Sequence, residues 1–203
     1  MRLRVTAKRV RREGLNLDGR EKMARILEKR PYGPGVHGPT SRRRITDYGK
    51  QLREKQRAKL VYGVMEKQFS NYFEKATNMK GDTAQNLVRL LETRLDNVLF
   101  RAGLTKTRAA ARQVISHAHV AVNGKKVDVA SFQVKPGDVV SIRDTKKDKK
   151  IWKIFLENLP KVEVPSWLTS DIKSLTVKVT SLPAADDLKQ IFEPQLIVEY
   201  YSR

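Results

Sequence analysis

Residues 94–124 read RLDNVLFRAGLTKTRAAARQVISHAHVAVNG, and they indicate the fold more clearly than any other part of the chain. The first part of this stretch completes an apolar pattern with helical spacing over residues 84–102, and Gly103 is suited to end that helix. Thr105 then predicts the N-cap of a second helix, because a threonine hydroxyl can accept a hydrogen bond from a free amide of the first turn. The stretch therefore predicts two consecutive helices.

The end of the same stretch predicts a β-hairpin. Residues 120–122 and 125–127 favour strands, and Asn123 with Gly124 favours a two-residue turn because both tolerate positive φ. A further turn and strand are expected over residues 136–142. The sequence therefore predicts an α+β fold with helices packed on a small antiparallel sheet.

The second helix is expected to present a basic face. Arg108, Arg112, Ser116 and His119 recur along one side of it, while its alanines, valine and isoleucine can pack inward. Because arginine bridges two phosphate oxygens at once, this face is suited to grip folded RNA, which proteins read through shape, phosphates and 2′-hydroxyls.

Positive charge is unevenly distributed along the 203 residues, whose formal net charge is +20. Residues 1–62 hold 19 Lys and Arg against 6 Asp and Glu, residues 63–159 hold 18 against 10, and residues 160–203 hold 5 against 6. A polyanionic partner is expected, because neutralising phosphates releases condensed counterions. The first two segments are expected to face RNA and the last to complete a core.

Composition excludes several other classes of protein. The chain has no apolar run long enough to span a bilayer and no apolar signal-peptide core, so we expect a cytoplasmic protein with no membrane partner. It contains no cysteine, which excludes disulfides, thiolate zinc sites and cysteine nucleophiles. No metal or cofactor is expected.

The N-terminal part predicts a basic arm followed by helices. We expect a short helix near residues 19–29, an irregular Pro and Gly loop over residues 30–39, and helices over residues 49–62 and 64–77. In the helix over residues 49–62, a stripe of Lys50, Arg53 and Arg57 could follow a phosphate backbone.

Three domains are expected from these patterns. Residues 1–48 form the basic arm and loop, residues 49–92 form a helical domain that residues 160–203 complete, and residues 93–159 form the RNA-binding domain. Within residues 160–203, residues 196–200 are expected to form a strand that packs on the helical domain.

The candidate RNA-binding residues share positive charge, hydrogen-bond donors or permissive backbone. They are Arg2, Arg4, Lys8, Arg9, Gly35, His37, Lys50, Arg53, Arg57, Arg94, Lys106, Thr107, Arg108, Arg112, Gln113, His117, His119, Asn123, Gly124 and Lys125. A metal role for the two histidines at 117 and 119 is disfavoured, because their i, i+2 spacing does not share a helix face and no further ligands accompany them. Packing or hydrogen bonding remains open for both.

Residues 93–142 resemble the S-four RNA-binding domain. The motifs that carry the resemblance are RLDNV, TRAAARQ, HAH and VNG, and the Gly33–Gly38 loop, DYGKQLREKQ and the ending LIVEYYS are similar to the whole bacterial small-subunit ribosomal protein family of that name. Ala118 stands where many members have glycine, and the N-terminal cysteine cluster that binds zinc in some members is missing.

The resemblance implies a structural constituent of the small ribosomal subunit. It implies primary binding of small-subunit ribosomal RNA, nucleation of subunit-body assembly, contact with ribosomal protein S-five and an effect on translational accuracy. It also implies that Arg42, Arg43 and Arg44 line the entrance of the messenger channel and contact messenger RNA. Repression of the protein's own translation is left open.

Two other functions compete with this interpretation. Pseudouridine synthases carry the same module and a catalytic Arg-Leu-Asp motif, but Arg94-Leu95-Asp96 lies in the opening helix of the module and the remaining chain is short for a catalytic domain. A structural role for Asp96, paired with neighbouring arginines, is favoured. A ribosome-associated RNA chaperone is the other alternative, and it would be retained on ribosomes only transiently.

Overall fold

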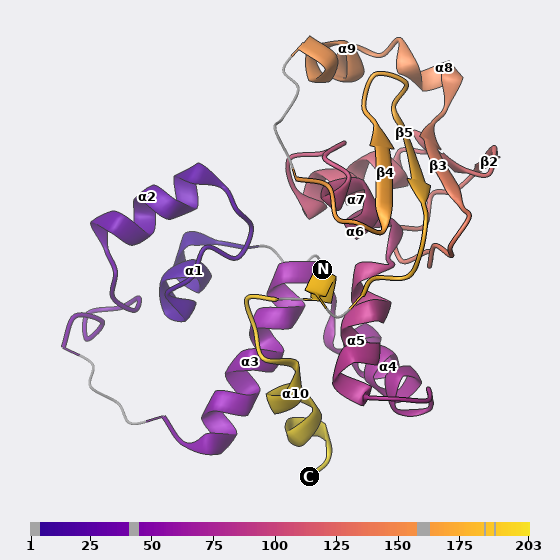
Figure 1. Ribbon diagram of the computed structural model, residues 1–203. Helices are drawn as coiled ribbons and strands as arrows, with labels where there is room; N and C mark the ends of the chain where they lie inside the picture. Colours follow the sequence, from indigo (N-terminus) through magenta and orange to yellow (C-terminus); the bar gives the residue numbers. More distant parts are fainter. Residues whose placement is uncertain (1–4, 41–44, 158–162, 185, 189) are drawn as a thin grey trace. The chain divides into compact units, whose positions relative to one another are not determined.

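The computed structural model describes residues 5–40, 45–157, 163–184, 186–188 and 190–203 (Figure 1). The chain divides into two compact units. The first comprises Met1–Val88 with Gln190–Arg203, and the second comprises Arg89–Lys189. The predicted α+β class is confirmed, since the first unit is helical over its described residues and the second combines helices with a five-stranded antiparallel sheet.

The first unit contains six helical segments in its described part. They are α1 (Ala7–Glu13), α2 (Glu21–Lys29), α3 (Asp47–Tyr62), α4 (Glu66–Thr77), the first turns of α5 (Thr83–Glu92), and α10 (Pro194–Tyr201). Thr46 begins α3 as an N-cap, since its hydroxyl accepts a hydrogen bond from the amide of Gly49 at 3.2 Å. Gly63 ends α3 with φ of 62°, a left-handed conformation that glycine adopts without strain.

The C-terminal helix α10 corrects the strand expected at residues 196–200. Pro194 occupies the first turn of α10, where its missing N–H would have had no intrahelical partner. The helix lies beside α3, and the amide of Gln51 donates a hydrogen bond to the carboxylate of Glu199 at 2.7 Å. Tertiary contacts thus override the strand propensity of Leu-Ile-Val, which a short apolar run by itself cannot settle.

A cluster around Glu66 fastens α10 to α3 and α4. The ammonium groups of Lys55 and Lys59 lie 2.9 and 2.6 Å from the Glu66 carboxylate, and the Tyr201 hydroxyl donates to the same carboxylate at 2.9 Å. The Lys55 ammonium also lies 4.1 Å from the centre of the Tyr200 ring. Burial raises the pKa of Glu66, but the three hydrogen bonds outweigh burial and lower this pKa to about 2.

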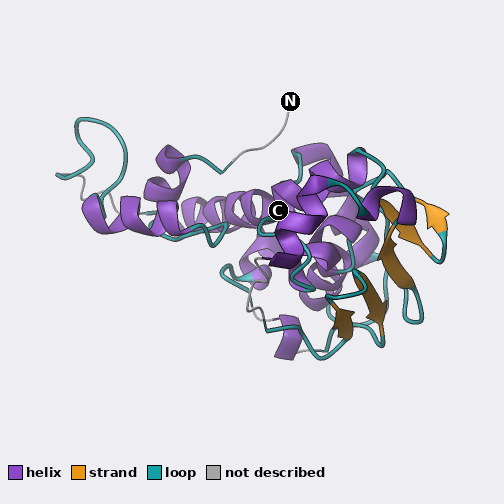
Figure 2. Cartoon of the chain, turned by 90° about the horizontal axis from the view of Figure 1, so that it is seen from above, coloured by secondary structure: helices purple, strands orange, loops and turns teal. Residues whose placement is uncertain are grey.

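The second unit is built on one antiparallel sheet with the order β2-β1-β3-β5-β4, which Figure 2 shows as a single layer of strands. The strands are β1 (Val120–Val122), β2 (Lys125–Lys126), β3 (Val139–Ile142), β4 (Leu168–Asp171) and β5 (Thr176–Val179). The helices of this unit are the end of α5, α6 (Leu95–Arg101), α7 (Arg108–Ser116), α8 (Asp144–Lys147), α9 (Lys150–Glu157) and the short 3₁₀ turn η1 (Asp186–Leu188).

The strands β4 and β5 change the expected role of the C-terminal segment. Residues 160–203 were expected to complete the helical domain, but β5 pairs with β3 and β4 pairs with β5 in the sheet of the second unit. The segment from Gln190 onward belongs to the first unit. Two short strands separated by a tight turn give little periodic signal, so only pairing with β3 decides where they belong.

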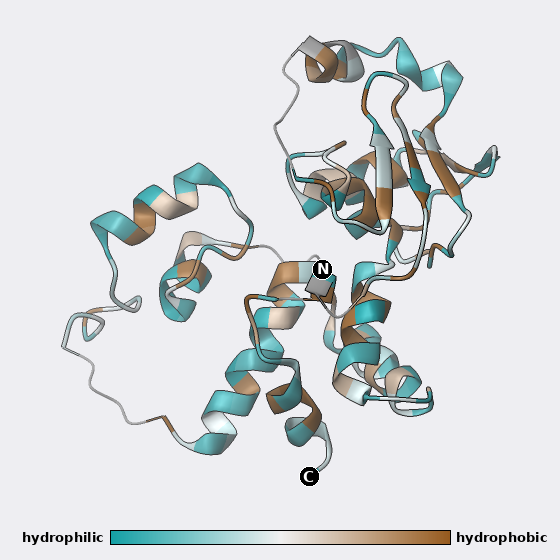
Figure 3. Cartoon of the chain, in the orientation of Figure 1, coloured by the Kyte–Doolittle hydropathy of each residue, from teal (hydrophilic) through white to brown (hydrophobic). Residues whose placement is uncertain are grey.

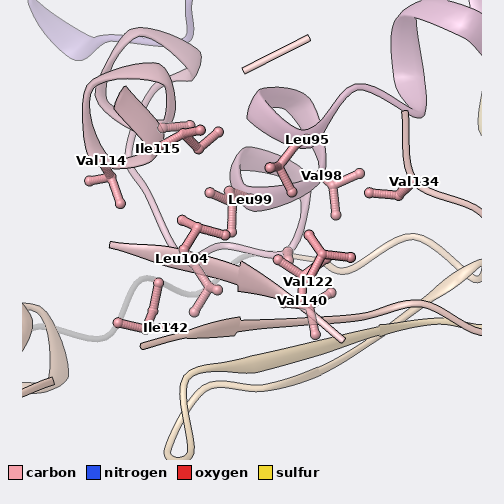
Figure 4. Packing of buried hydrophobic residues seen from close by; sticks show 14 of the residues in the cluster. Leu95, Val98, Leu99, Leu104, Val114, Ile115, Val122, Val134, Val140 and Ile142 are labelled. Atoms are coloured by element: carbon pink, nitrogen blue, oxygen red, sulfur yellow. The ribbon is translucent and has the colours of Figure 1, made fainter. Parts of the chain in front are cut away.

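The core of the second unit lies between the sheet and the helices α6 and α7. Figure 4 shows Leu95, Val98 and Leu99 of α6 facing Val122, Val140 and the neighbouring strand residues, and all of these side chains are buried. Along β5, hydrophilic and hydrophobic residues alternate (Figure 3), and its two valines are buried. This alternation is typical of a sheet with one face against a core.

The predicted helix over residues 84–102 is two helices, because Arg94 has an extended backbone with ψ of 139°. The amides of Leu95 and Asp96 donate to the carbonyls of Phe132 and Ala130 at 2.9 and 3.2 Å, so the chain bonds to a neighbouring loop at this point. This break separates α6 from α5. It also brings Arg94 and Asp96 into the interior of the second unit.

Candidate nucleic-acid interface

The most prominent polar group of the second unit is a buried ion triad around Asp96. Arg94 donates two hydrogen bonds from one edge of its guanidinium to the Asp96 carboxylate, at 3.0 Å from Nε and 2.8 Å from Nη2. Arg112 of α7 donates to Asp96 Oδ2 at 3.1 Å from Nε and 2.6 Å from Nη2. The side chains of Arg94, Asp96 and Arg112 are 2%, 1% and 21% exposed. The triad therefore joins α7 to the start of α6.

A second network joins the same helices through Asn97. The Asn97 amide nitrogen donates to the Glu92 carboxylate at 2.7 Å, and Asn97 Oδ1 accepts a hydrogen bond from Arg108 Nε at 2.7 Å. Arg101 forms a two-point ion pair with the Glu92 carboxylate at 3.0 and 2.9 Å. The Arg108 guanidinium also lies 4.4 Å from the centre of the Phe100 ring. Polar side chains of the RLDNV segment thus hold the helices in register.

These networks correct the expected basic face of α7. Arg94 does not fit an RNA-contacting role, because its side chain is buried and its guanidinium forms an ion pair with Asp96. The guanidinium groups of Arg108 and Arg112 point to partners on α6, at Asn97 and Asp96. Helical spacing places these arginines on one side of α7 correctly, but it does not show that α6 covers that side.

A different side of α7 is open to solvent. Lys106 precedes the helix, and Gln113, Ser116 and His117 follow along its exposed side, while Lys125 is exposed on the hairpin. These exposed side chains carry positive charge and hydrogen-bond donors, and none of them is acidic. Four of them, Lys106, Gln113, His117 and Lys125, define the candidate RNA surface of the second unit.

Three of the other predicted contacts shape the backbone beside this surface. Thr107 is the N-cap of α7, in place of the expected Thr105, since its hydroxyl accepts from the amide of Ala110 at 3.1 Å. Asn123 and Gly124 have φ of 49° and 77°, as the predicted turn requires. The side chain of Asn123 is bonded to Asp138 at 2.8 Å and to the amide of Val139 at 2.9 Å. It therefore fixes the hairpin.

In the first unit, the expected stripe on α3 is partly neutralised. Arg57 donates to Glu13 at 3.0 Å and is paired with Glu54, while Arg53 lies 3.7 Å from Glu13. Arg57 is therefore largely buried between carboxylates and does not fit a phosphate contact. The exposed Lys50 is paired with Asp47 at 3.0 Å, which leaves it accessible to another anion.

The N-terminal arm and loop carry the remaining predicted contacts. Lys8 and His37 are exposed, and Gly35 is exposed with φ of 102°. Arg9 is partly buried on α1. Arg2, Arg4 and the triplet Arg42, Arg43 and Arg44, expected at the messenger channel, lie outside the described residues.

Arg11 is a residue whose role the sequence does not indicate. Its guanidinium donates to the carbonyls of Tyr32 at 3.2 Å and Gly33 at 3.0 Å, and it lies 5.1 Å from the centre of the Tyr32 ring. A Cβ atom at Gly38 would stand 2.0 Å from the Gly33 carbonyl oxygen, so the loop closes tightly on itself. Arg11 therefore holds the Pro and Gly loop, and only its proximity in space reveals this.

Comparisons with known proteins match two consecutive domains along the chain. The ribosomal protein S4/S9 N-terminal domain matches residues 3–92, and the S4 (S-four) domain matches residues 93–140. The chain is 44% identical to small ribosomal subunit protein uS4 of Chlorobium limicola over 90% of both chains. It is 48% identical to the uS4 protein of Natranaerobius thermophilus, over 87% of this chain and 85% of the relative. The chain belongs to the uS4 family.

Membership of the uS4 family identifies a non-enzymatic structural protein and removes the pseudouridine synthase alternative. The burial of Asp96 gives the physical reason. A carboxylate that is 1% exposed and bonded to two guanidinium groups cannot reach a base in an RNA substrate. The interpretation of Asp96 as a partner of neighbouring arginines is confirmed, although it is buried and not on the surface.

The described part of the uS4 chain offers neither a cluster of metal ligands nor a helix that could span a membrane. Among the residues that the structure describes, no three His, Asp or Glu side chains gather in a way that could hold a metal ion. Within the same residues, no helix is both long and apolar enough to cross a bilayer.

Proposed function

We propose that this chain is a structural constituent of the small ribosomal subunit and binds its ribosomal RNA. The observation that carries the proposal is the match to uS4 proteins, which extends over nine-tenths of the chain and includes both the N-terminal domain and the S4 domain. A chaperone that only borrowed the S4 module would share residues 93–140 without the preceding 90 residues. The net charge of +20 supports a polyanionic partner.

The second unit contributes a rigid surface to this function. Lys106 and Lys125 supply charge, and Gln113 and His117 supply hydrogen-bond donors, on a backbone that the Asp96 and Asn97 networks hold in place. Folded RNA is recognised largely through phosphates and shape, so fixed donors suit it better than mobile ones. The arginines of these networks therefore support RNA binding indirectly, as positioning residues.

We further propose the finer roles that the family resemblance implies. The protein would bind ribosomal RNA early, nucleate assembly of the subunit body, contact ribosomal protein S-five and influence translational accuracy. Arg42, Arg43 and Arg44 would contact incoming messenger RNA. Replacing Arg43 and Arg44 together should then impair unwinding of structured messenger more than incorporation into subunits, and equal impairment of both would reject this separation.

The test of the main proposal is retention on ribosomes. Small subunits washed in high salt should retain about one copy of the protein each, and subunits reconstituted without it should fail to assemble normally. Loss of the protein under mild washing, together with normal assembly in its absence, would favour the chaperone alternative. A salt titration of binding to purified small-subunit RNA should show affinity falling steeply with ionic strength.

A further inference from the structure

His119 is held in an unusual arrangement just beyond α7. The indole Nε1–H of Trp152, on α9, donates a hydrogen bond to His119 Nδ1 at 3.0 Å. The backbone of His119 is fixed as well, because its carbonyl accepts from the amide of Arg143 at 2.8 Å. The Arg143 side chain donates to the carbonyl of Ala118 at 3.1 Å. Both the ring and the backbone of His119 therefore have a defined position.

The bond from Trp152 determines which nitrogen of His119 carries a proton. An indole N–H can only donate, so Nδ1 must be an unprotonated acceptor, and in a neutral imidazole the proton then resides on Nε2. Within the described part of the chain, Nε2 has no hydrogen-bond partner, and the His119 side chain is half-buried. The result is a single N–H donor with a fixed direction.

The surroundings of His119 are cationic. Burial lowers the pKa of His119 first, and the nearby charges of Lys146, His117 and Lys149 lower it further. The acidic residue of α8, Asp144, is paired with Lys147 at 2.8 Å. His119 is therefore neutral at physiological pH although it lies among lysines, and it contributes a donor without a charge.

We propose that the Nε2–H of His119 donates a hydrogen bond to a phosphate oxygen of ribosomal RNA, while Lys146 and Lys149 neutralise the same stretch of RNA backbone. Trp152 acts as a positioning residue that fixes the tautomer of His119. This inference rests on the proposed function, and it extends the RNA surface from α7 and the hairpin onto α8 and the start of α9. The Nε2–H of His119 lies near the positive charges of Lys146 and Lys149, and these charges favour an anionic oxygen as its acceptor.

Two isosteric substitutions separate the donor from the acceptor of His119. His119→Asn retains an amide group near the Nδ1 position whose oxygen can accept from Trp152, but it has no atom at the Nε2 position. His119→Gln retains an N–H near the Nε2 position but has no acceptor for Trp152. In the full-length protein, His119→Asn should keep its thermal stability and lose RNA affinity by about tenfold. His119→Gln should keep more RNA affinity and lose stability.

The salt dependence of binding supplies the second readout. Because His119 is uncharged, His119→Asn should lower affinity at every salt concentration without changing the slope of log affinity against log salt. Lys149→Gln removes a phosphate-neutralising charge and should reduce that slope by about one. ¹⁵N chemical shifts of His119 should report the Nε2–H tautomer in the wild-type protein and a mixture of tautomers in Trp152→Phe.

Each outcome decides the inference. Wild-type affinity in His119→Asn, or a reduced salt slope in that variant, would overturn the neutral-donor role. If His119→Gln bound RNA more weakly than His119→Asn, in the same order as their stabilities, the role of His119 would be purely structural. An Nδ1–H tautomer in the wild-type protein would also reject the neutral-donor role. Failure of the wild-type protein to bind small-subunit RNA would reject the proposed function itself, which the other outcomes leave intact.

Discussion

Replacing Asp96 by asparagine should destabilise the second unit severely. The substitution leaves the side-chain volume nearly unchanged but removes the charge that faces two guanidinium groups, of which Arg94 is 2% exposed and Arg112 is 21% exposed. Breaking a buried ion pair by neutralising one partner costs roughly 3–5 kcal/mol, because the other charge stays buried without compensation. Since Arg112 reaches some solvent, we expect a loss of about 3–4 kcal/mol.

Urea unfolding followed by tryptophan fluorescence measures this loss in the intact chain. Both tryptophans of the sequence, Trp152 and Trp167, lie buried in the second unit, so their emission reports on that unit. With a denaturant slope of about 2 kcal/mol per molar urea, the loss corresponds to a midpoint lowered by about 1.5–2 M. Asp144→Asn is the matched control, because Asp144 is 93% exposed and its pair with Lys147 should contribute little.

A triple substitution tests the physical reason for the effect of Asp96→Asn. Arg94→Met, Asp96→Leu and Arg112→Leu together remove all charges of the triad, and apolar side chains of similar volume can replace a buried ion cluster with little loss of stability. We expect the triple variant to regain most of the lost stability. A midpoint for Asp96→Asn within about 0.5 M of the wild type would refute the assignment of the triad as a stabilising, desolvated cluster.

Four further predictions concern other parts of the chain. Gly38→Ala should open the Pro and Gly loop and speed its cleavage by proteases, because a Cβ atom would meet a carbonyl at 2.0 Å, whereas Gly33→Ala meets nothing within 4 Å and should resemble the wild type. Glu66→Gln should speed hydrogen exchange in α10 at neutral pH, because it removes the carboxylate that Lys55, Lys59 and Tyr201 bond. The ionised carboxylate contributes its full stability above about pH 4.5, and this contribution is lost as the pH falls toward 2. Hydrogen exchange in the wild type and the variant should therefore become equal near pH 2. Lys146→Gln should raise the pKa of His119, as measured by NMR titration. An unchanged pKa would show that the Lys146 charge does not act on His119. Because the depressed pKa of His119 means that the folded state binds fewer protons, the second unit should lose stability as the pH falls below about 6.5.

The pH and salt experiments address different groups. Salt dependence counts the charges that neutralise phosphates, so it responds to exposed lysines such as Lys106 and Lys125. Arg108→Ala and Arg112→Ala, which the sequence pattern assigned to phosphate contacts, should instead lower stability with a smaller change in salt slope, because their guanidinium groups are bonded to α6. Loss of RNA affinity by these two variants would then reflect a displaced α7.

Local signals that depend on a few neighbouring residues were readable from the sequence. The Asn123-Gly124 turn, the helix over residues 49–62 and the α+β class follow from backbone preferences and from the period of apolar residues. The uneven charge of the chain and its motifs pointed to RNA, which agrees with membership of the uS4 family. The helix break at Arg94 was not readable, because the partners of its neighbours lie more than 30 residues later in the chain.

Charged residues, favoured turns and the family resemblance could be recognised from the amino-acid sequence, because these properties reside in the residues and their close neighbours. Which cations face solvent and which are paired inside the molecule became apparent only in the folded chain. Arg94, Arg112 and Lys106 read alike as basic residues, yet two of them neutralise Asp96 and the third is exposed. Burial and ion pairing depend on segments that folding brings together, and they separate the residues that hold the RNA surface in shape from those available to touch RNA.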